Sequence, residues 1–331
     1  MDNLTHTLTG FFLSRAGLNR LSPDGTWILV VAANAPDLDV VSWAGGSAFF
    51  LHWHRNFTHS LAFAPLLAIA SVLFVRAFTR VRVKWGAAFA IALMGVFSHI
   101  LLDLTNNYGV RPFLPFSAQW FHWDFTYVLD FWIWGIYALC LFAPMLSRLV
   151  SSEMESRRMR FPGRGWPVFA LLFLATYDCG RMMLHRRAIN VLDARTYAGE
   201  EPLREWAFAS PASPFSWNGV VETQNRMVLF DDLGVNDDFN PDLGTSFFKT
   251  SPGDFLPTLR KLPGFGTLIE FDQVPLWRKI EEESSPRYLL TDLRFGDPVA
   301  QTFTCSARMR NAGEAFDSRC DFTFSSGFER H

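Results

Sequence analysis

Imidazole and carboxylate side chains recur in four short motifs in the first third of the chain, namely LTHT, APDLD, HRNFTHS and SHILLD. These two groups are common protein ligands of divalent metals, zinc in particular. His99 and Asp103 are four residues apart, so on a helix they project from one face. The candidate ligands are His6, Asp37, Asp39, His54, His59, His99 and Asp103.

Four apolar stretches surround these motifs and predict membrane-spanning helices. The chain of 331 residues is 49% hydrophobic, and a span needs about 20 mostly apolar residues. The fourth stretch is the shortest and continues past Asp178 toward Leu184. The expected spans are Ser60–Val75, Trp85–Leu102, Phe125–Leu146 and Trp166–Tyr177.

The basic residues between the spans predict an orientation. The positive-inside rule places loops rich in Lys and Arg in the cytoplasm, whereas the connection over 103–124 holds only Arg111. We therefore expect an inner-membrane protein with several spans and an extracytoplasmic C-terminal domain. The basic loop residues are Arg76, Arg80, Arg82, Lys84, Arg148, Arg157, Arg158, Arg160 and Arg164.

The spans also bring the polar motifs to one membrane face. His59 begins the first span, while His99 and Asp103 end the second, and consecutive spans with a short loop are antiparallel. Before them, a stripe of Leu4, Leu8, Phe11 and Phe12 predicts an amphipathic helix. The run TWILVVAANAPDLDVVSW, residues 26–43, is interrupted by Pro36 and favours a re-entrant or packed segment.

The residues after Leu192 are richer in Gly, Pro and Asp and alternate in polarity. GTLIEFDQV, RYLLTDLRFG, QTFTCSARMR and FDSRCDFTF are typical of strands separated by turns. The predicted fold is thus an α-helical membrane domain, residues 1–192, with about four transmembrane helices and an amphipathic N-terminal helix. A β-rich soluble domain, residues 193–331, follows it.

Two of the four cysteines are expected to form a disulfide. A hairpin whose turn contains Asn311, Ala312 and Gly313 places Cys305 opposite Cys320, close enough to be bridged. Disulfides persist outside the cytoplasm, which agrees with the topology. The cysteines expected to be free are Cys140 and Cys179.

A metal site at the shared face would resolve the cost of polar groups at membrane depth. Zinc suits two imidazoles and a carboxylate, while manganese, magnesium or a metal pair suits a site richer in carboxylates. Asp37 or Asp39 could act as general base. Arg55 and Arg111 could hold an anionic headgroup or simply anchor the chain at the interface. His54 is five residues before His59, so we expect it in a loop.

The same motifs carry a resemblance to a known family. MDNLTHTLTG, ANAPDLDV, HRNFTHSL and SHILLDLTNNYGVRPFLPFS look like the YdjM-like proteins, known as LexA-regulated, membrane-bound metal-dependent hydrolases. The resemblance covers residues 1–135 and implies an inner-membrane protein with a metal site and hydrolase activity. It matches the same seven candidate ligands from His6 to Asp103 and implies no particular substrate.

The sequence favours a metal-dependent hydrolase acting on a phosphoryl or acyl ester of a membrane lipid or a lipid-linked substrate. A net charge of −2 gives no field for binding nucleic acid. One alternative is a non-catalytic membrane protein with a structural metal and a partner-binding β-domain. Another is a transporter, for which Asp130 and Asp178 are the charged candidates within spans. The oligomeric state is left open.

Overall fold

The computed structural model describes residues 1–331 except 154–163, 212, 235–238, 283–284, 311–313 and 324–331, and only the backbone of 146–153. Contacts within the chain group it into two units. The first contains Met1–Asp39 and Arg55–Met182, and the second contains Val40–His54 and Met183–His331. The basic loop residues Arg157, Arg158 and Arg160 lie outside the described residues.

The first unit is helical, and its helices follow the apolar stretches of the sequence. Helix α4 begins with a proline in its first turn, a position that proline favours. The elements are α1 (Asn3–Ala16), α2 (Gly25–Asn34), η2 (Pro36–Gly45), α3 (Ser47–Trp53), η3 (Phe57–His59), α4 (Ala64–Thr79), α5 (Trp85–Leu104), α6 (Phe131–Glu153) and α7 (Gly165–Asp193).

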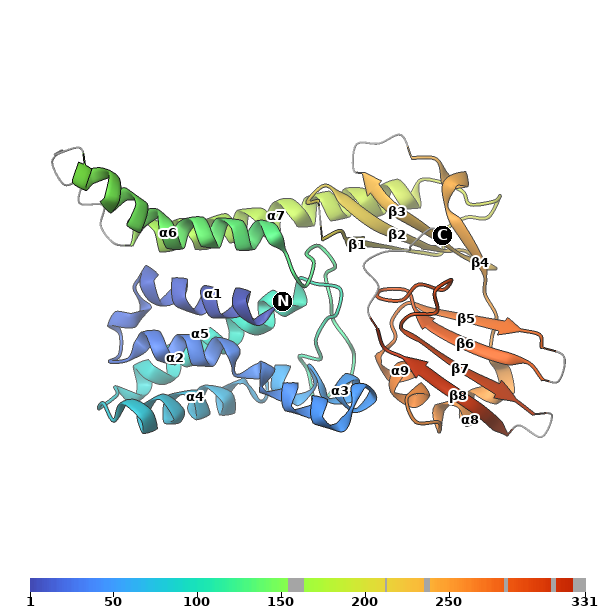
Figure 1. Cartoon of the computed structure of the whole chain (residues 1–331), viewed down its shortest axis with the longest axis horizontal. Helices are drawn as coiled ribbons and strands as arrows, with labels where there is room; N and C mark the ends of the chain where they lie inside the picture. The colour runs from blue at the N-terminus through green and yellow to red at the C-terminus, as the bar shows by residue number, and fades with distance from the viewer. Residues whose placement is uncertain (154–163, 212, 235–238, 283–284, 311–313, 324–331) are drawn as a thin grey trace. The chain divides into compact units, whose positions relative to one another are not determined.

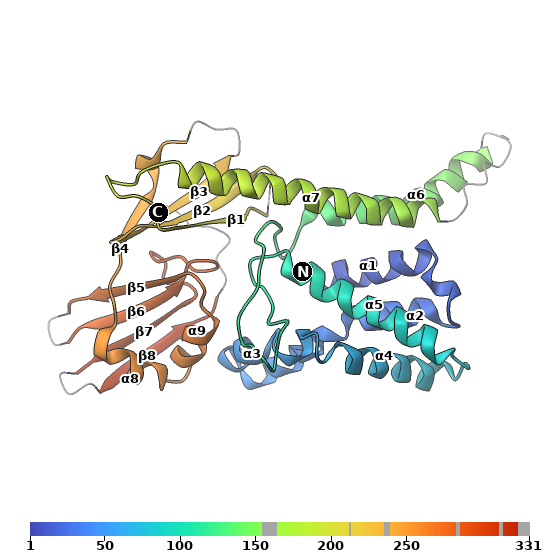
Figure 2. The same cartoon turned by 180° about the vertical axis from the view of Figure 1, so that it is seen from behind.

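Helix α2 lies at the centre of this unit, in contact with α1, α4 and α5 (Figures 1 and 2). Two glycines allow this close packing. A Cβ atom on Gly10 would lie 2.9 Å from the Cβ of Ala33, and one on Gly95 would lie 2.9 Å from the Cβ of Ala32. Small residues at helix contacts let backbones approach closely, and this approach brings the polar ends of α1, α2 and α5 together.

The structure supports the predicted membrane character in its coarse form. Among the described residues, α5 and α7 are long and apolar enough to cross a membrane. The number rises to four if each of two bent pairs is a single span: α2 with η2, bent by 43°, and Ser47–His59 with α4, bent by 88°. The apolar part of α6 is shorter, over Phe131–Met145. Helix α7 extends well beyond the short fourth stretch of the sequence.

The N-terminal helix is not the simple amphipathic helix that its sequence predicts. Leu4, expected on the buried stripe, is exposed, whereas Thr5, His6 and Thr9 are buried. The polar side of α1 faces inward because α1 packs on α2 and α5. Phe12 keeps its expected burial, in a cluster with residues of α6 and α7.

The second unit contains two antiparallel four-stranded sheets, each a simple meander. Apolar residues of both sheets, including Val220, Leu229 and Leu276, share one core. The strands are β1 (Arg204–Ala209), β2 (Ser216–Glu222), β3 (Arg226–Gly234), β4 (Thr245–Phe248), β5 (Pro275–Ile280), β6 (Arg287–Asp292), β7 (Thr304–Met309) and β8 (Ala315–Asp321). The short helices are α8 (Leu256–Arg260) and α9 (Phe265–Phe271).

Three of the four quoted strands are confirmed as β6, β7 and β8, but the first is wrong. GTLIEFDQV lies mostly in helix α9. The helix starts after Gly264, whose φ of 81° turns the chain, and buries Phe265, Leu268 and Phe271. That spacing of three is helical, and it outweighs the β propensity of the intervening residues.

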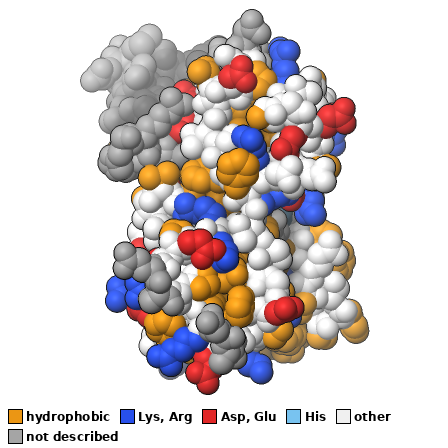
Figure 3. Space-filling view, turned by 90° about the vertical axis from the view of Figure 1, so that its right-hand side faces the viewer, with side chains coloured by type: hydrophobic (Ala, Val, Ile, Leu, Met, Phe, Trp, Pro, Cys, Tyr) orange, Lys and Arg blue, Asp and Glu red, His pale blue; other side chains and the backbone are white. Residues whose placement is uncertain are grey.

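The predicted disulfide is confirmed. Cys305 of β7 lies opposite Cys320 of β8, and the two are bonded. Cys140 and Cys179 are free, as expected. The turn residues Asn311, Ala312 and Gly313 lie outside the described residues. The face of the second unit seen in Figure 3 carries basic and acidic side chains among small apolar patches, as expected for a polar surface.

Candidate metal centre

Four side chains from separate elements of the first unit meet in its interior: Asp37 of η2, His59 of η3, and His99 and Asp103 of α5. Each offers a ligand atom, and these four atoms all lie within 4.8 Å of one another. His59, His99 and Asp103, which the predicted spans bring to one face, thus lie together. The cluster is therefore positioned by the start of η2, the end of η3 and the last turns of α5.

The distances within the cluster are uniform. The Nε2 atoms of His59 and His99 are 3.1 Å apart. The Oδ2 atom of Asp103 lies 3.1 Å from the former and 3.2 Å from the latter. The Oδ1 atom of Asp37 lies 3.6 Å and 3.5 Å from the same two nitrogens. Ligand atoms about 2.1 Å from one zinc ion in tetrahedral geometry are roughly 3.4 Å apart, so the spacing fits.

The outer nitrogen of each imidazole is already committed as a donor. The Nδ1 atom of His99 lies 2.7 Å from the carbonyl oxygen of Ala33, which can only accept. The Nδ1 atom of His59 lies 3.0 Å from the Oγ1 atom of Thr58, whose hydroxyl donates to Asp39. Each Nδ1 atom therefore carries a proton, which leaves Nε2 as the ring nitrogen that can bind a metal.

The two Nε2 atoms face one another and two carboxylates, an arrangement that needs protons or a metal cation between them. The Oδ2 atom of Asp103 is buried and has no hydrogen bond among the described residues. Burying such acceptors without partners costs several kcal/mol. The chemistry and spacing of the donor set fit a divalent metal held by Asp37, His59, His99 and Asp103.

His6 is buried beside this cluster. Its ring stacks on that of His99 at 3.6 Å between centroids, and its Nε2 atom lies 3.4 Å from the Oδ1 atom of Asp103. Neither ring nitrogen of His6 has a hydrogen bond among the described residues. Burial lowers the pKa of His6 to about 3. The imidazole is therefore neutral, the form that binds metals.

Asp39 lies next to the outer ring nitrogen, Nδ1, of His59. Its Oδ2 atom accepts hydrogen bonds of 2.8 Å from the backbone N–H of Arg55 and from the hydroxyl of Thr58, and lies 3.4 Å from Nδ1 of His59. A carboxylate in this position orients the imidazole and raises its basicity. His54 belongs to the second unit, where it ends α3 and its ring stacks on Phe50.

Arg55 is buried with the cluster. Its Nη2 atom lies 2.9 Å from the Oδ1 atom of Asp103, and its Nη1 atom donates to the side-chain oxygen of Asn106 at 3.0 Å. Its backbone has a φ of 56°, a conformation uncommon outside glycine. Arg111, by contrast, lies with its guanidinium 4.4 Å from the centroid of the Trp120 ring.

Sequence reasoning missed Thr58 and Asn106, which hold His59 and Arg55 in place. Both are embedded in the quoted motifs, as the threonine of HRNFTHS and the first asparagine of LTNNYG. Short polar residues adjoining candidate ligands were the available signal. Asp130, the proposed transport residue, instead accepts from the backbone N–H groups of Trp132 and Ile133 at the start of α6, and from the hydroxyl of Tyr177.

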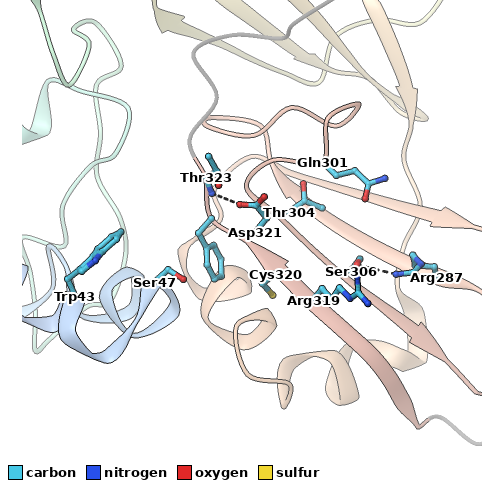
Figure 4. Close-up of a pocket in the computed structure, with 11 residues that line it drawn as sticks. Trp43, Ser47, Arg287, Gln301, Thr304, Ser306, Arg319, Cys320, Asp321 and Thr323 are labelled. Carbon is cyan, nitrogen blue, oxygen red and sulfur yellow. Dashed lines mark hydrogen bonds between the residues drawn. The ribbon is translucent and has the colours of Figure 1, made fainter. Parts of the chain in front are cut away.

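The second unit contains a cavity of about 780 Å³ (Figure 4). Polar residues of its strands line it, among them Arg287, Ser306 and Arg319, together with Trp43 and Ser47. Both arginines pair with Asp317, at 3.3 Å and 3.5 Å. The charges of the two arginines are thus compensated by a neighbouring carboxylate.

The helical unit, with membrane-length helices and a buried His–Asp cluster, defines a membrane protein with a candidate metal centre. Residues 1–188 match the family described as "YdjM inner membrane protein". This chain belongs to that family, which confirms the resemblance seen in its motifs. The matched region contains every candidate ligand.

A curated relative and the solved structures add little further detail. The chain is 28% identical over 132 residues to "Uncharacterized protein YfhP" of Bacillus subtilis (strain 168), a match covering 36% of this chain and 39% of that protein. The chain therefore spans well under half the length of that relative. No solved structure shows significant similarity to it.

Proposed function

We propose that this protein is a membrane-bound, metal-dependent hydrolase that attacks a phosphoryl or acyl ester of a membrane lipid or lipid-linked substrate. The observation that carries the proposal is the pair of Nε2 atoms of His59 and His99, 3.1 Å apart and facing two carboxylates. Zinc is the favoured ion because two imidazoles and carboxylates match its preferences, with manganese and magnesium as the other candidates.

The charges favour a single divalent ion. Asp37, Asp39 and Asp103 supply three negative side chains, while Arg55 and the amino group of Met1, which contacts Asp103, supply at most two positive charges. When the histidines are neutral, one divalent ion therefore brings the site close to neutrality. A second ion would leave an excess positive charge in a buried site.

The residues of the site have separate roles in this mechanism. A bound divalent ion would supply a water of lowered pKa and a Lewis acid for the ester oxygen. With His59, His99 and Asp103 as the catalytic ligands, Asp37 would be left to accept the proton of the attacking water, while Asp39 would keep the proton on Nδ1 of His59. Arg55 holds Asp103 in place and provides a donor for an anionic ester group, and Arg111 is a more distant candidate.

A non-catalytic membrane protein with a structural metal is the second candidate. The side chains of His59, His99 and Asp103 have no exposed surface, and a closed site with four protein ligands is typical of structural zinc. A catalytic site requires an open position for water. Retention of the metal without any ester hydrolysis would favour this second candidate.

Metal analysis of the detergent-purified chain tests the proposal. We expect about one zinc ion per wild-type chain and loss of that ion from His99→Ala. His52→Ala is the matched control, because His52 pairs with Glu270 in the second unit. A parallel screen of phosphate and acyl esters should show hydrolysis that the wild type and the control share. Equal metal content in all three proteins would contradict the proposed site.

We also propose that the second unit is extracytoplasmic. The basic loops and the bond between Cys305 and Cys320 support this side. A periplasmic reporter fused after His331 should be active. A fusion active only as a cytoplasmic reporter would reverse the topology without affecting the metal site.

A further inference from the structure

The outer face of η2 is apolar, although the same segment carries two carboxylates of the site. Asp37 is buried and Asp39 is largely so, and both turn toward His59. The apolar residues between and after them are turned outward. Their exposed fractions are 64% for Leu38, 56% for Val40 and 73% for Val41, whereas Trp43 lines the cavity of the second unit.

The chain around this face lacks charge. Residues 40–54 contain no Lys, Arg, Asp or Glu. Phe49 and Trp53 of α3 are also exposed. Contiguous exposed apolar surface marks a contact with a partner or a membrane. Helix α2 and η2 form one of the two bent pairs. The segment Ser47–His59, which contains α3, forms the other with α4. Each pair is a candidate span.

The carboxylates restrict where η2 can lie. Ionised side chains are costly at the centre of a bilayer, whereas a segment with one apolar and one polar side is stable where acyl chains meet headgroups. Asp37 and Asp39 are also the least buried acids of the site: their side chains are 9% and 7% exposed, against 0% for Asp103. Any approach to the cluster is therefore nearest to η2.

We infer that the outer face of η2, formed by Leu38, Val40 and Val41, inserts into the acyl–headgroup boundary of the leaflet. A lipid substrate then reaches the site sideways from the bilayer, past Asp37, without leaving the membrane. This inference rests on the proposed hydrolase function for its substrate, while the placement of η2 stands independently.

Nitroxide labelling in vesicles of phosphatidylcholine and phosphatidylglycerol tests the placement. The full chain carries Val41→Cys in a background of Cys140→Ala and Cys179→Ser. Matched labels are Leu66→Cys, an exposed apolar position of α4, and Ser318→Cys, an exposed position of β8. Collision rates with oxygen and with a water-soluble nickel chelate report the depth of each label.

We expect the label at position 41 to favour oxygen over the nickel chelate, at a shallower depth than the label at position 66. Nickel access equal to that of the label at position 318 would place η2 in water and overturn the inference. Low access to both reagents would show that protein, either a partner or a second copy, covers this face, and would overturn it as well.

A second measurement tests lateral entry. The double variant Val40→Gln, Val41→Gln should hydrolyse a lipid ester in vesicles about tenfold more slowly, a factor that corresponds to about 1.4 kcal/mol. Its metal content and its rate with a water-soluble ester of the same chemistry should not change. Leu203→Gln, an exposed position of the second unit, is the control. Equal loss with both esters, or no loss, would refute lateral entry.

The two proposals fail in different ways. If the metal-loaded wild type hydrolyses neither ester, the hydrolase function fails, and the nitroxide labels still decide whether η2 lies in lipid. If both esters are cleaved and the label at Val41 faces water, the function stands and the lipid-facing surface is wrong.

Discussion

The two units of this protein bury charged side chains in different ways. In the second unit, Asp292 and Arg294 are two residues apart and fully paired, with contacts of 2.5–3.1 Å. Arg294 also donates to the carbonyl oxygen of Phe271 and lies over the rings of Phe271 and Phe295. In the first unit, the cluster gathers residues from three elements, and its acceptors face one another.

The difference separates a structural ion pair from a ligand set. A buried pair whose donors all have acceptors needs nothing more from its surroundings. The cluster of Asp37, His59, His99 and Asp103 has an excess of acceptors, and only a proton or a cation can relieve it. Burial of charge is thus shared by both sites, whereas the balance of donors and acceptors distinguishes them.

Loss of a ligand should have the largest effect. In Asp103→Asn, a neutral amide replaces the carboxylate nearest to both Nε2 atoms, so we expect metal affinity to fall at least about 100-fold. The control is Asp130→Asn, a buried aspartate of the same unit that caps α6 and should keep its metal. Metal content and metal-dependent thermal stabilisation measure the effect. Equal losses in both variants would mean that the cluster is not a specific site.

Breaking the ion pair of Asp292 and Arg294 should destabilise the second unit and leave the metal content unchanged. Arg294→Met leaves Asp292 buried and unpaired, at a cost of about 3–5 kcal/mol. Replacing both residues, as in Asp292→Leu with Arg294→Met, should recover part of that loss. Denaturant unfolding followed by circular dichroism measures the change. Loss of metal from Arg294→Met would show that the two sites are not independent.

The disulfide of the second unit should contribute a smaller effect. Cys305 and Cys320 close a loop of 15 residues, which corresponds to about 3 kcal/mol of stabilisation. Cys305→Ser with Cys320→Ser should lower the unfolding free energy by about that amount and leave the metal content unchanged. Cys179→Ser, at an exposed free cysteine, should have little effect. A stable double variant would show that the sheet alone fixes this hairpin.

The candidate metal cluster was predictable because its geometry follows from simple rules. His59 precedes an apolar helix and Asp103 ends the next one, so an antiparallel pair brings them together. The role of Arg55 was not predictable. Its contact with Asp103 depends on a left-handed backbone at Arg55 and on the loop that places Asn106, neither of which leaves a periodic signal.

The positions of the long helices were predictable because apolar composition determines them. Their ends were missed because single residues determine where a helix begins. The third span was expected from Phe125, yet α6 begins at Phe131, because Asp130 accepts from the first backbone N–H groups. Helix α9 was predicted as a strand, because its seven residues include β-favouring types and are too few to show a clear helical period.

The smallest expected effect concerns pH. Burial, followed by the neighbouring Asp292 carboxylate, raises the pKa of Asp272 well above its usual range, against the opposing Arg294 guanidinium. Above a pH of about 4, the unfolded chain releases this proton while the folded unit keeps it. The unfolding free energy of the second unit should therefore fall as the pH rises from about 4 toward neutrality.

Asp272→Asn should remove this slope, because the amide does not titrate, and should raise the melting temperature at pH 7 by a few degrees. Asp242→Asn, at an exposed aspartate of the same unit, is the control and should keep the wild-type slope. Thermal melts between pH 4 and pH 7.5 measure both. If Asp272→Asn kept the wild-type slope, Asp272 would titrate normally, and the buried acids of the second unit would be as fully compensated as Asp292.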